Sequence, residues 1–207
     1  MVQKESKVAD ARRRGRPRAY DPDTALARAA DTFWQNGYDG TSLDDLAAAT
    51  GMNRPSLYAA FGDKRDLYLK TLTRYRDGAR ATTLTLLADD PPLRVFLERF
   101  YRAALDLYFA SGARGCYSIG TAATQARVDP KVRAFLADSI RDTDTFLAKQ
   151  IRAARARGEV ARNADPAALA QLATATLHTL AVRARAAVPR KELNALFAMT
   201  IDTICAK

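Results

Sequence analysis

Three of the four Asp-Pro pairs in this chain each open an amphipathic segment, and they constrain most strongly what the chain can fold into. They lie at Asp21-Pro22, Asp129-Pro130 and Asp165-Pro166. The aspartate side chain accepts backbone N–H groups that the first helical turn leaves unpaired, and proline suits that turn because it has no N–H to pair. Apolar residues then recur at helical spacing, and no segment alternates apolar and polar residues as a half-buried strand does. The sequence therefore predicts an all-α fold.

Caps, glycines and prolines divide the sequence into about nine helices and two domains. A turn with two prolines, Asp89-Asp90-Pro91-Pro92, marks the boundary between the domains. We expect a disordered basic arm over residues 1–18, a small helical domain over residues 19–80 and a larger one over residues 91–207. The expected helices span about residues 21–36, 42–50, 54–61, 63–80, 93–110, 116–125, 130–158, 166–188 and 193–204.

Charge narrows the choice of partners. The chain carries 33 basic and 23 acidic side chains, a net charge of +10. This surplus favours a polyanion, either nucleic acid or an anionic membrane surface. The longest uncharged run, residues 166–182, is too short and too polar to span a membrane, so no membrane partner is expected. The arm lacks the apolar core of a secretory signal, and we expect a cytoplasmic protein.

The second and third expected helices are joined by Gly51-Met52-Asn53. A three-residue turn that contains glycine lets two helices meet at a steep angle, as in the helix-turn-helix unit that places its second helix in the major groove of DNA. The same spacing also occurs in small helical bundles that bind nothing. Spacing alone therefore leaves both interpretations open.

Residues 41–67 resemble the DNA-binding domain of TetR-type transcriptional regulators. The resemblance rests on Leu46-Ala47, Thr50-Gly51, Leu57-Tyr58 with Phe61, and Lys64, with Thr50 standing where the family usually has alanine. It implies a three-helix DNA-binding domain followed by a helical ligand-binding and dimerisation domain. It also implies a sequence-specific repressor that a small-molecule effector releases from a palindromic duplex operator. An architectural nucleic-acid-binding protein without an effector is the alternative.

The resemblance and the local chemistry together predict the DNA contacts. Hydroxyls at a helix N-terminus favour phosphate, and an arginine at the start of the third helix can reach a guanine edge or a phosphate. The predicted contacts are Thr41, Ser42, Asn53, Arg54, Pro55, Ser56, Tyr58 and Lys64. Asn53 and Ser56 can instead be helix caps, and Arg54 and Lys64 can be solvated surface charges.

The basic arm contains Arg-Gly-Arg-Pro at residues 14–17, preceded by Arg12 and Arg13 and followed by Arg18. This stretch resembles the AT-hook core, which lays arginines into a narrow minor groove. We therefore add Arg16 and Arg18 to the predicted DNA contacts. A solvated basic tail is the alternative.

Residues 91–207 contain no recognisable catalytic motif, so we expect no enzyme, no cofactor and no metal site. The resemblance implies instead an apolar effector pocket, and side chains that could line it are Phe96, Phe100, Tyr108, Cys116, Tyr117, Phe146 and His178. Ordinary core packing is the alternative for each aromatic residue, and His178 suits either a pocket or a dimer interface. Cys116 follows Arg114-Gly115 at an expected helix start, which would lower its pKa and make it a sensor; otherwise it is a small buried apolar residue.

A homodimer is expected through the eighth and ninth helices. Their apolar residues exceed what a terminal helical hairpin can bury by itself, and a four-helix bundle with a second copy would cover them. These residues are Leu169, Leu172, Leu177, Leu180, Leu193, Leu196, Phe197, Ile201 and Ile204.

Overall fold

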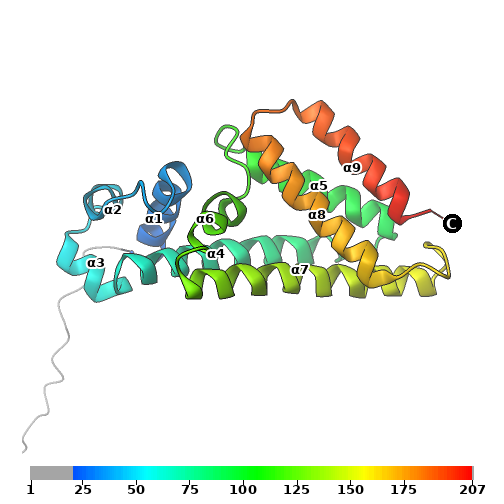
Figure 1. The fold of residues 1–207 in the computed structure, drawn as a ribbon, viewed down its shortest axis with the longest axis horizontal. Helices are drawn as coiled ribbons and strands as arrows, with labels where there is room; N and C mark the ends of the chain where they lie inside the picture. Colours follow the sequence, from blue (N-terminus) through cyan, green and yellow to red (C-terminus); the bar gives the residue numbers. More distant parts are fainter. Residues whose placement is uncertain (1–20, 207) are drawn as a thin grey trace, which may run out of the picture.

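The computed structural model describes residues 21–206, and this part of the chain is helical without a β-strand (Figure 1). The prediction of an all-α fold with nine α-helices is confirmed. The helices are α1 (Pro22–Asn36), α2 (Leu43–Thr50), α3 (Arg54–Phe61), α4 (Lys64–Thr85), α5 (Leu93–Phe109), α6 (Ala123–Gln125), α7 (Pro130–Ala156), α8 (Pro166–Arg185) and α9 (Arg190–Ile204), with a π-helical turn η1 (Ser118–Ala122) before α6. None of these helices is long and apolar enough to cross a membrane.

The Asp-Pro signals begin helices where the sequence predicts them. The carboxylates of Asp21, Asp129 and Asp165 each accept the backbone N–H two residues further on, at 3.3, 2.8 and 2.9 Å. Each proline occupies the first turn of its helix. These caps are local, because both partners of every hydrogen bond lie within one turn of the chain.

Two segments depart from the expected boundaries. The fourth helix continues to Thr85, past the expected end near Arg80, because the apolar periodicity fades there but no residue that breaks a helix follows. The expected sixth helix is a π-helical turn and a three-residue α-helix, and Cys116 lies before both of them. Tyr117, Thr121 and Ala122 of this segment are buried, and two of them are hydrogen-bonded to α4, so tertiary contacts decide its path more than helix propensity does.

The described residues form two apolar cores. One core lies among α5, α7, α8 and α9, and the other lies among α1–α4 at the opposite end of the molecule (Figure 1). The second core is completed by Tyr117, Ala122 and Val132, which follow the expected domain boundary in sequence. The DNA-binding candidate helices therefore pack around residues contributed by the larger domain.

Three hydroxyl-bearing or phenolic side chains of α4, Tyr68, Thr71 and Tyr75, connect the two parts of the chain. Tyr68 OH donates a hydrogen bond to Thr121 Oγ1 at 2.6 Å, and Tyr75 OH donates to Cys116 Sγ at 3.5 Å. The Thr71 hydroxyl, one turn from Tyr68, shares a 2.7 Å hydrogen bond with the Tyr117 hydroxyl. Tyr68, Thr71 and Tyr117 are buried, so their hydroxyls need these partners. The segment 116–121 is thereby attached to the middle of α4.

The same segment also touches α8 through Gly115. This residue has a φ of +66°, and a Cβ built on it would lie 2.4 Å from the Ala181 carbonyl oxygen of α8. Only glycine permits both the left-handed backbone and this close approach. Gly112 provides a comparison, because its φ is +87° but no atom lies within 4 Å of a Cβ built there.

We expect Gly115→Ala to destabilise the protein more than Gly112→Ala does. Both variants incur the left-handed backbone penalty of about 1–2 kcal/mol, whereas Gly115→Ala adds an overlap with backbone that typically costs about 1–3 kcal/mol. Thermal unfolding of the two variants beside the wild type measures the difference. Equal melting temperatures for the two variants would show that residues 114–121 do not pack tightly against α8.

Candidate nucleic-acid interface

The sequence Thr41 to Phe61 folds as a helix-turn-helix. Ser42 caps α2 in a capping box, in which Ser42 Oγ accepts from the Asp45 N–H at 3.1 Å and Asp45 Oδ2 accepts from the Ser42 N–H at 2.8 Å. Gly51 ends α2 in the left-handed conformation at φ +70°. Asn53 then caps α3, with Oδ1 accepting from the Ser56 N–H at 2.9 Å. The alternative role of Asn53 as a helix cap is confirmed, and Ser42 is a helix cap as well.

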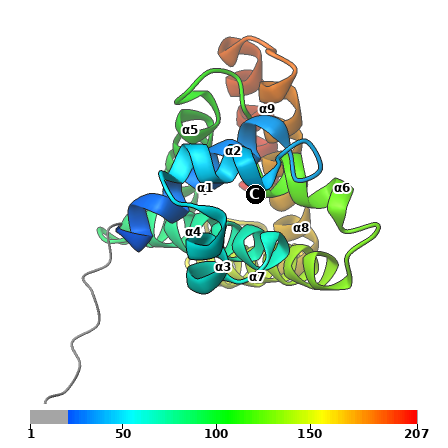
Figure 2. The ribbon, with the colours of Figure 1, turned by 90° about the vertical axis from the view of Figure 1, so that its left-hand side faces the viewer.

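One side of α3 is anchored and the other is open. Leu57 and Phe61 are buried against α1, α2 and α4, and they keep the helix in place. Tyr58 is a large exposed side chain at 47 %, and Arg54 is also exposed. Together with α2, this helix lies at the end of the molecule that faces the viewer in Figure 2. A helix held by one face and exposed on the other is suited to entering a groove.

Thr41 differs from its expected role. The side chain is 1 % exposed, and its hydroxyl donates to the Gly37 carbonyl oxygen at 2.6 Å. The expectation that this hydroxyl contacts phosphate is therefore wrong, because it is used to close the turn between α1 and α2. Ser42 is exposed, although its hydroxyl is already bonded to Asp45.

Arg54 has a partner that the local sequence did not indicate. Its Nε donates to Asp44 Oδ1 at 2.8 Å, and its Nη2 donates to Asp44 Oδ2 at 2.5 Å. The hydrogen bonds from Arg54 hold the pKa of the Asp44 carboxyl below its ordinary value, so this exposed pair is ionised at neutral pH. Arg54 is thus directed by α2 as well as by its own helix.

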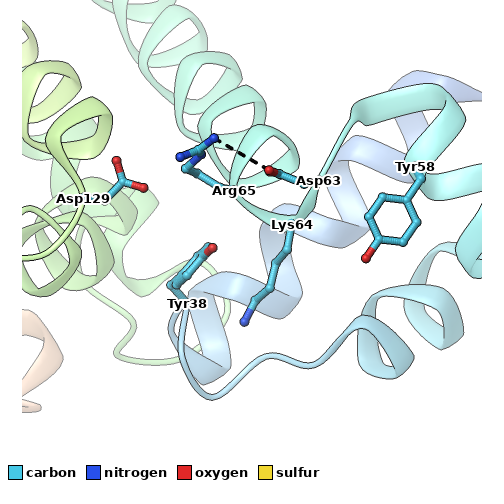
Figure 3. A pocket seen from close by; sticks show the side chains of 6 residues that line it. All are labelled: Tyr38, Tyr58, Asp63, Lys64, Arg65 and Asp129. Carbon is cyan, nitrogen blue, oxygen red and sulfur yellow. Dashed lines mark ion pairs between the residues drawn. The ribbon is translucent and has the colours of Figure 1, made fainter.

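Lys64 lies in a hollow of about 430 Å³ at the start of α4 (Figure 3). Six side chains line it: Tyr38, Tyr58, Asp63, Lys64, Arg65 and Asp129. The Lys64 ammonium group lies 4.4 Å from the centre of the Tyr38 ring, a cation–π distance. Burial lowers the pKa of Lys64, and the carboxylates of Asp39 and Asp45 act in the opposite direction.

Tyr38 was not among the predicted site residues. Its ring stacks on Phe33, with centroids 6.0 Å apart, and lies 5.0 Å from the Tyr68 ring. The ring is therefore fixed by the core while its other side faces Lys64. A tyrosine after a helix-ending glycine carries no sequence signal for this role, since the contact with Lys64 forms only in the folded chain.

Arg16 and Arg18 lie outside the described residues, as does the rest of the expected arm. Within residues 21–206, no group of histidine, cysteine, aspartate or glutamate side chains is arranged to hold a metal ion.

Two family models match the chain. "Bacterial regulatory proteins, tetR family" matches residues 25–71, and "Tetracyclin repressor-like, C-terminal domain" matches residues 92–198. The chain belongs to the TetR family of bacterial transcriptional regulators. The predicted resemblance is thereby confirmed, and with it the conclusion that the chain is a DNA-binding regulator and not an enzyme.

Individual relatives agree with the family assignment. The HTH-type transcriptional repressor ComR of Escherichia coli K12 is 28 % identical over 190 residues, which cover 91 % of this chain and 90 % of ComR. The uncharacterised regulator YezE of Bacillus subtilis is 32 % identical over 160 residues, 76 % of this chain and 82 % of YezE. A cysteine variant of CifR, solved with 26-base-pair operator DNA, is 32 % identical with a TM-score of 0.84, covering 92 % of this chain and all of that one.

The residues predicted for an effector pocket lie in both cores of this TetR-family chain. Phe96 packs against Phe100 and Phe146 in the larger core, with ring centroids 5.9 and 6.0 Å away. Tyr108 is buried in the same core, whereas Tyr117 belongs to the core of α1–α4. The expectation that these aromatic residues face one pocket is corrected in this respect, because Tyr117 packs against Tyr68 and Tyr75 instead.

His178 of α8 is half-buried. It lines an open hollow of about 430 Å³ with Thr179, Val182 and Arg183. Burial lowers the pKa of His178, and the nearby Asp144 carboxylate of α7 acts in the opposite direction. One side of this residue therefore faces α7 and the other faces the surface.

Cys116 does not have the environment that its sequence neighbours suggested. The Arg114 guanidinium points away from it, pairing with Asp31 at 3.1 Å and lying over the Trp34 ring at 4.3 Å. Burial raises the pKa of the Cys116 thiol, and the hydrogen bond from Tyr75 offsets only part of this rise. The expected lowering of the pKa is wrong, and the alternative of a small core residue describes Cys116 better.

We expect Cys116 to react slowly with iodoacetamide at pH 7. The thiolate is the reactive species, and a raised pKa leaves less of it than the ordinary value of about 8.5 would. The labelling rate of Cys116 should rise with pH and continue to rise above pH 9. Mass spectrometry of the Cys205→Ser variant follows this site alone, with the unfolded protein as reference. Equal rates in folded and unfolded protein at pH 7 would contradict the burial of this thiol.

Proposed function

We propose that this TetR-family regulator is a homodimeric repressor that binds a palindromic duplex operator through α3 and is released by a small-molecule effector. The observation that carries the proposal is the open face of α3. Arg54 and Tyr58 are exposed there, Tyr58 lines one hollow with Lys64 of α4, and Leu57 and Phe61 anchor the helix from the buried side. The CifR variant solved with operator DNA and the repressor ComR support it as relatives.

The proposed contacts divide into two kinds. Tyr58 and Lys64 bind the phosphate backbone and set the register of α3 in the groove. Arg54 reads a base edge, and short polar side chains surround it. The complete set in this proposal is Arg16, Arg18, Ser42, Asn53, Arg54, Pro55, Ser56, Tyr58 and Lys64. Thr41 no longer belongs to it, because its hydroxyl is buried.

The proposed dimer uses only part of the apolar set on α8 and α9 that the sequence suggested. Leu180, Leu193, Phe197, Ile201 and Ile204 are buried within the chain itself, so they cannot drive dimerisation. Leu172 of that set remains exposed in the single chain at 39 %, and so do two large apolar side chains outside it, Val182 at 59 % and Met199 at 69 %. Exposed apolar side chains on two adjacent helices suit a four-helix bundle with a second copy.

The proposed effector enters between α7 and α8, beside the aromatic side chains of α5. Thr174 is 3 % exposed, and its hydroxyl lacks a hydrogen-bond partner among the described residues, as does the buried Oδ1 of Asp144. Buried polar atoms without partners are costly, and a bound molecule can satisfy them. His178 lies next to Asp144 and one turn from Thr174. The effector class proposed here is an aromatic or apolar molecule with a hydrogen-bond donor.

A displacement of α8 at the proposed effector site can be transmitted to the DNA-binding helices through residues 114–121. This segment touches α8 at Gly115 and is bonded to α4 through Thr121 and Tyr117. A shift of α8 would therefore tilt α4 and change the distance between the two α3 helices of a dimer. The buried thiol of Cys116 makes its oxidation a poorer trigger than a ligand is, because little thiolate forms.

The operator and the dimer can be tested in one set of experiments. Selection of duplexes from a random pool should yield a palindrome whose half-site centres are about 34–36 Å apart, or a multiple of one helical turn. Sedimentation should show a dimer at micromolar concentration, and Val182→Asp should convert it to a monomer with weaker operator binding. A monomeric wild type that coats all DNA alike would favour an architectural protein instead.

We expect Lys64→Ala to weaken binding to all duplexes by the same factor. A phosphate contact contributes without reading sequence, and its loss should reduce the slope of log affinity against log salt by about one. Lys149→Ala, an equal charge change on an exposed residue of α7, is the matched control and should leave the slope nearly unchanged. A change of base preference in Lys64→Ala would assign this residue to base reading.

A further inference from the structure

The ion pair between Arg54 and Asp44 joins the two helices of the helix-turn-helix at their N-terminal ends. Arg54 is the first residue of α3, and Asp44 lies in the first turn of α2. Their side chains are 54 % and 71 % exposed, so the pair is at the surface that α3 presents. The two hydrogen bonds, at 2.8 and 2.5 Å, engage both carboxylate oxygens and fix the plane of the guanidinium group.

Helix stability does not account for this arrangement. A cation at a helix N-terminus is disfavoured by the helix dipole, and α3 has no acidic residue in its first turn to compensate for Arg54. An exposed ion pair contributes little to folding, because water screens the two charges. What the pair does provide is orientation, because two parallel hydrogen bonds leave the guanidinium group little freedom to rotate.

The edge of Arg54 that remains unused is the one that reads guanine. Asp44 accepts hydrogen bonds from the Nε–H group of Arg54 and from one of the two N–H groups of Nη2. A guanidinium group has five N–H donors, so Nη1 and the second hydrogen of Nη2 are left as a parallel pair. Such a pair matches the O6 and N7 acceptors that guanine displays in the major groove. The Asp44 carboxylate therefore binds the edge of the guanidinium group formed by Nε and Nη2, and it leaves the terminal edge formed by Nη1 and Nη2 available.

We propose that Asp44 is a specificity-determining residue, which positions Arg54 to read a guanine in each half of the operator. Asp44 itself does not touch the base and acts through Arg54. This inference rests on the proposed operator binding, which it extends by naming one base of the half-site and the residue that fixes its reader. As DNA excludes water from the pair, the attraction between the two charges grows and the orientation becomes firmer.

Asp44→Asn tests the proposal because the two possible roles of Asp44, a negative charge near phosphate or a positioning residue, predict opposite changes in affinity for the operator. If Asp44 were only a negative charge near phosphate, its removal would strengthen binding to every duplex alike. If Asp44 positions Arg54, the variant should bind the selected operator about 5- to 10-fold more weakly and discriminate less against other bases at the contacted position. The position is identified first, as the guanine whose replacement no longer matters in Arg54→Ala.

A second exposed pair supplies the matched control. Asp23 accepts from Arg74 at 3.2 Å in the same domain, and both side chains are exposed. Asp23→Asn removes the same charge without touching Arg54, so base discrimination should stay at the wild-type level. In the double variant Asp44→Asn with Arg54→Ala, the first change should cause no further loss of discrimination. Thermal unfolding of each variant establishes that the fold is retained.

Three results would overturn the proposal. Tighter binding of Asp44→Asn to all duplexes, with unchanged base discrimination, would leave operator binding intact and remove the positioning role. Unchanged discrimination in Arg54→Ala would show that Arg54 reads no base. A wild type that selects no operator would contradict the proposed function itself, and this outcome is seen before any variant is made.

Discussion

The contact between α4 and residues 114–121 is the interaction on which the arrangement of this protein depends. Buried hydroxyls of α4 bond to Tyr117 and Thr121, and Gly115 approaches the α8 backbone so closely that no side chain fits. The core of the helix-turn-helix domain is therefore completed by residues from the second domain. This joint provides the packed route along which the proposed effector would change the geometry of the DNA-binding end.

In the function proposed above, the same joint lets an effector and DNA compete without sharing a surface. A molecule at the proposed place between α7 and α8 would contact the helix that Gly115 touches, whereas the proposed DNA contact is made by α3, which shares a core with α4. Such an effector need only bind more tightly to the dimer in which the two α3 helices are wrongly spaced than to the dimer in which they fit two successive major grooves. Each tenfold difference in that affinity corresponds to about 1.4 kcal/mol.

At the end of the molecule that carries α2 and α3, the positions of individual cations matter more than the net charge. Residues 21–80 carry nearly balanced charge, so a count of lysines and arginines does not locate the interface. Instead, Lys64 is placed over the fixed ring of Tyr38, and Arg54 is aligned by Asp44. Both cations keep donors free for DNA while their freedom of movement is reduced, which lowers the entropy lost on binding.

The sequence by itself determined the helices, their caps and the family. Asp21, Ser42 with Asp45, Gly51 and Asn53 act on neighbours within about one turn, so their roles follow from spacing alone. Only the tertiary structure decided which side chains are desolvated and which distant groups meet. It buried the hydroxyl of Thr41, raised the pKa of Cys116, paired Arg54 with a residue of another helix, and divided the aromatic residues between two cores. These outcomes depend on packing between elements far apart in the chain, which local spacing does not encode.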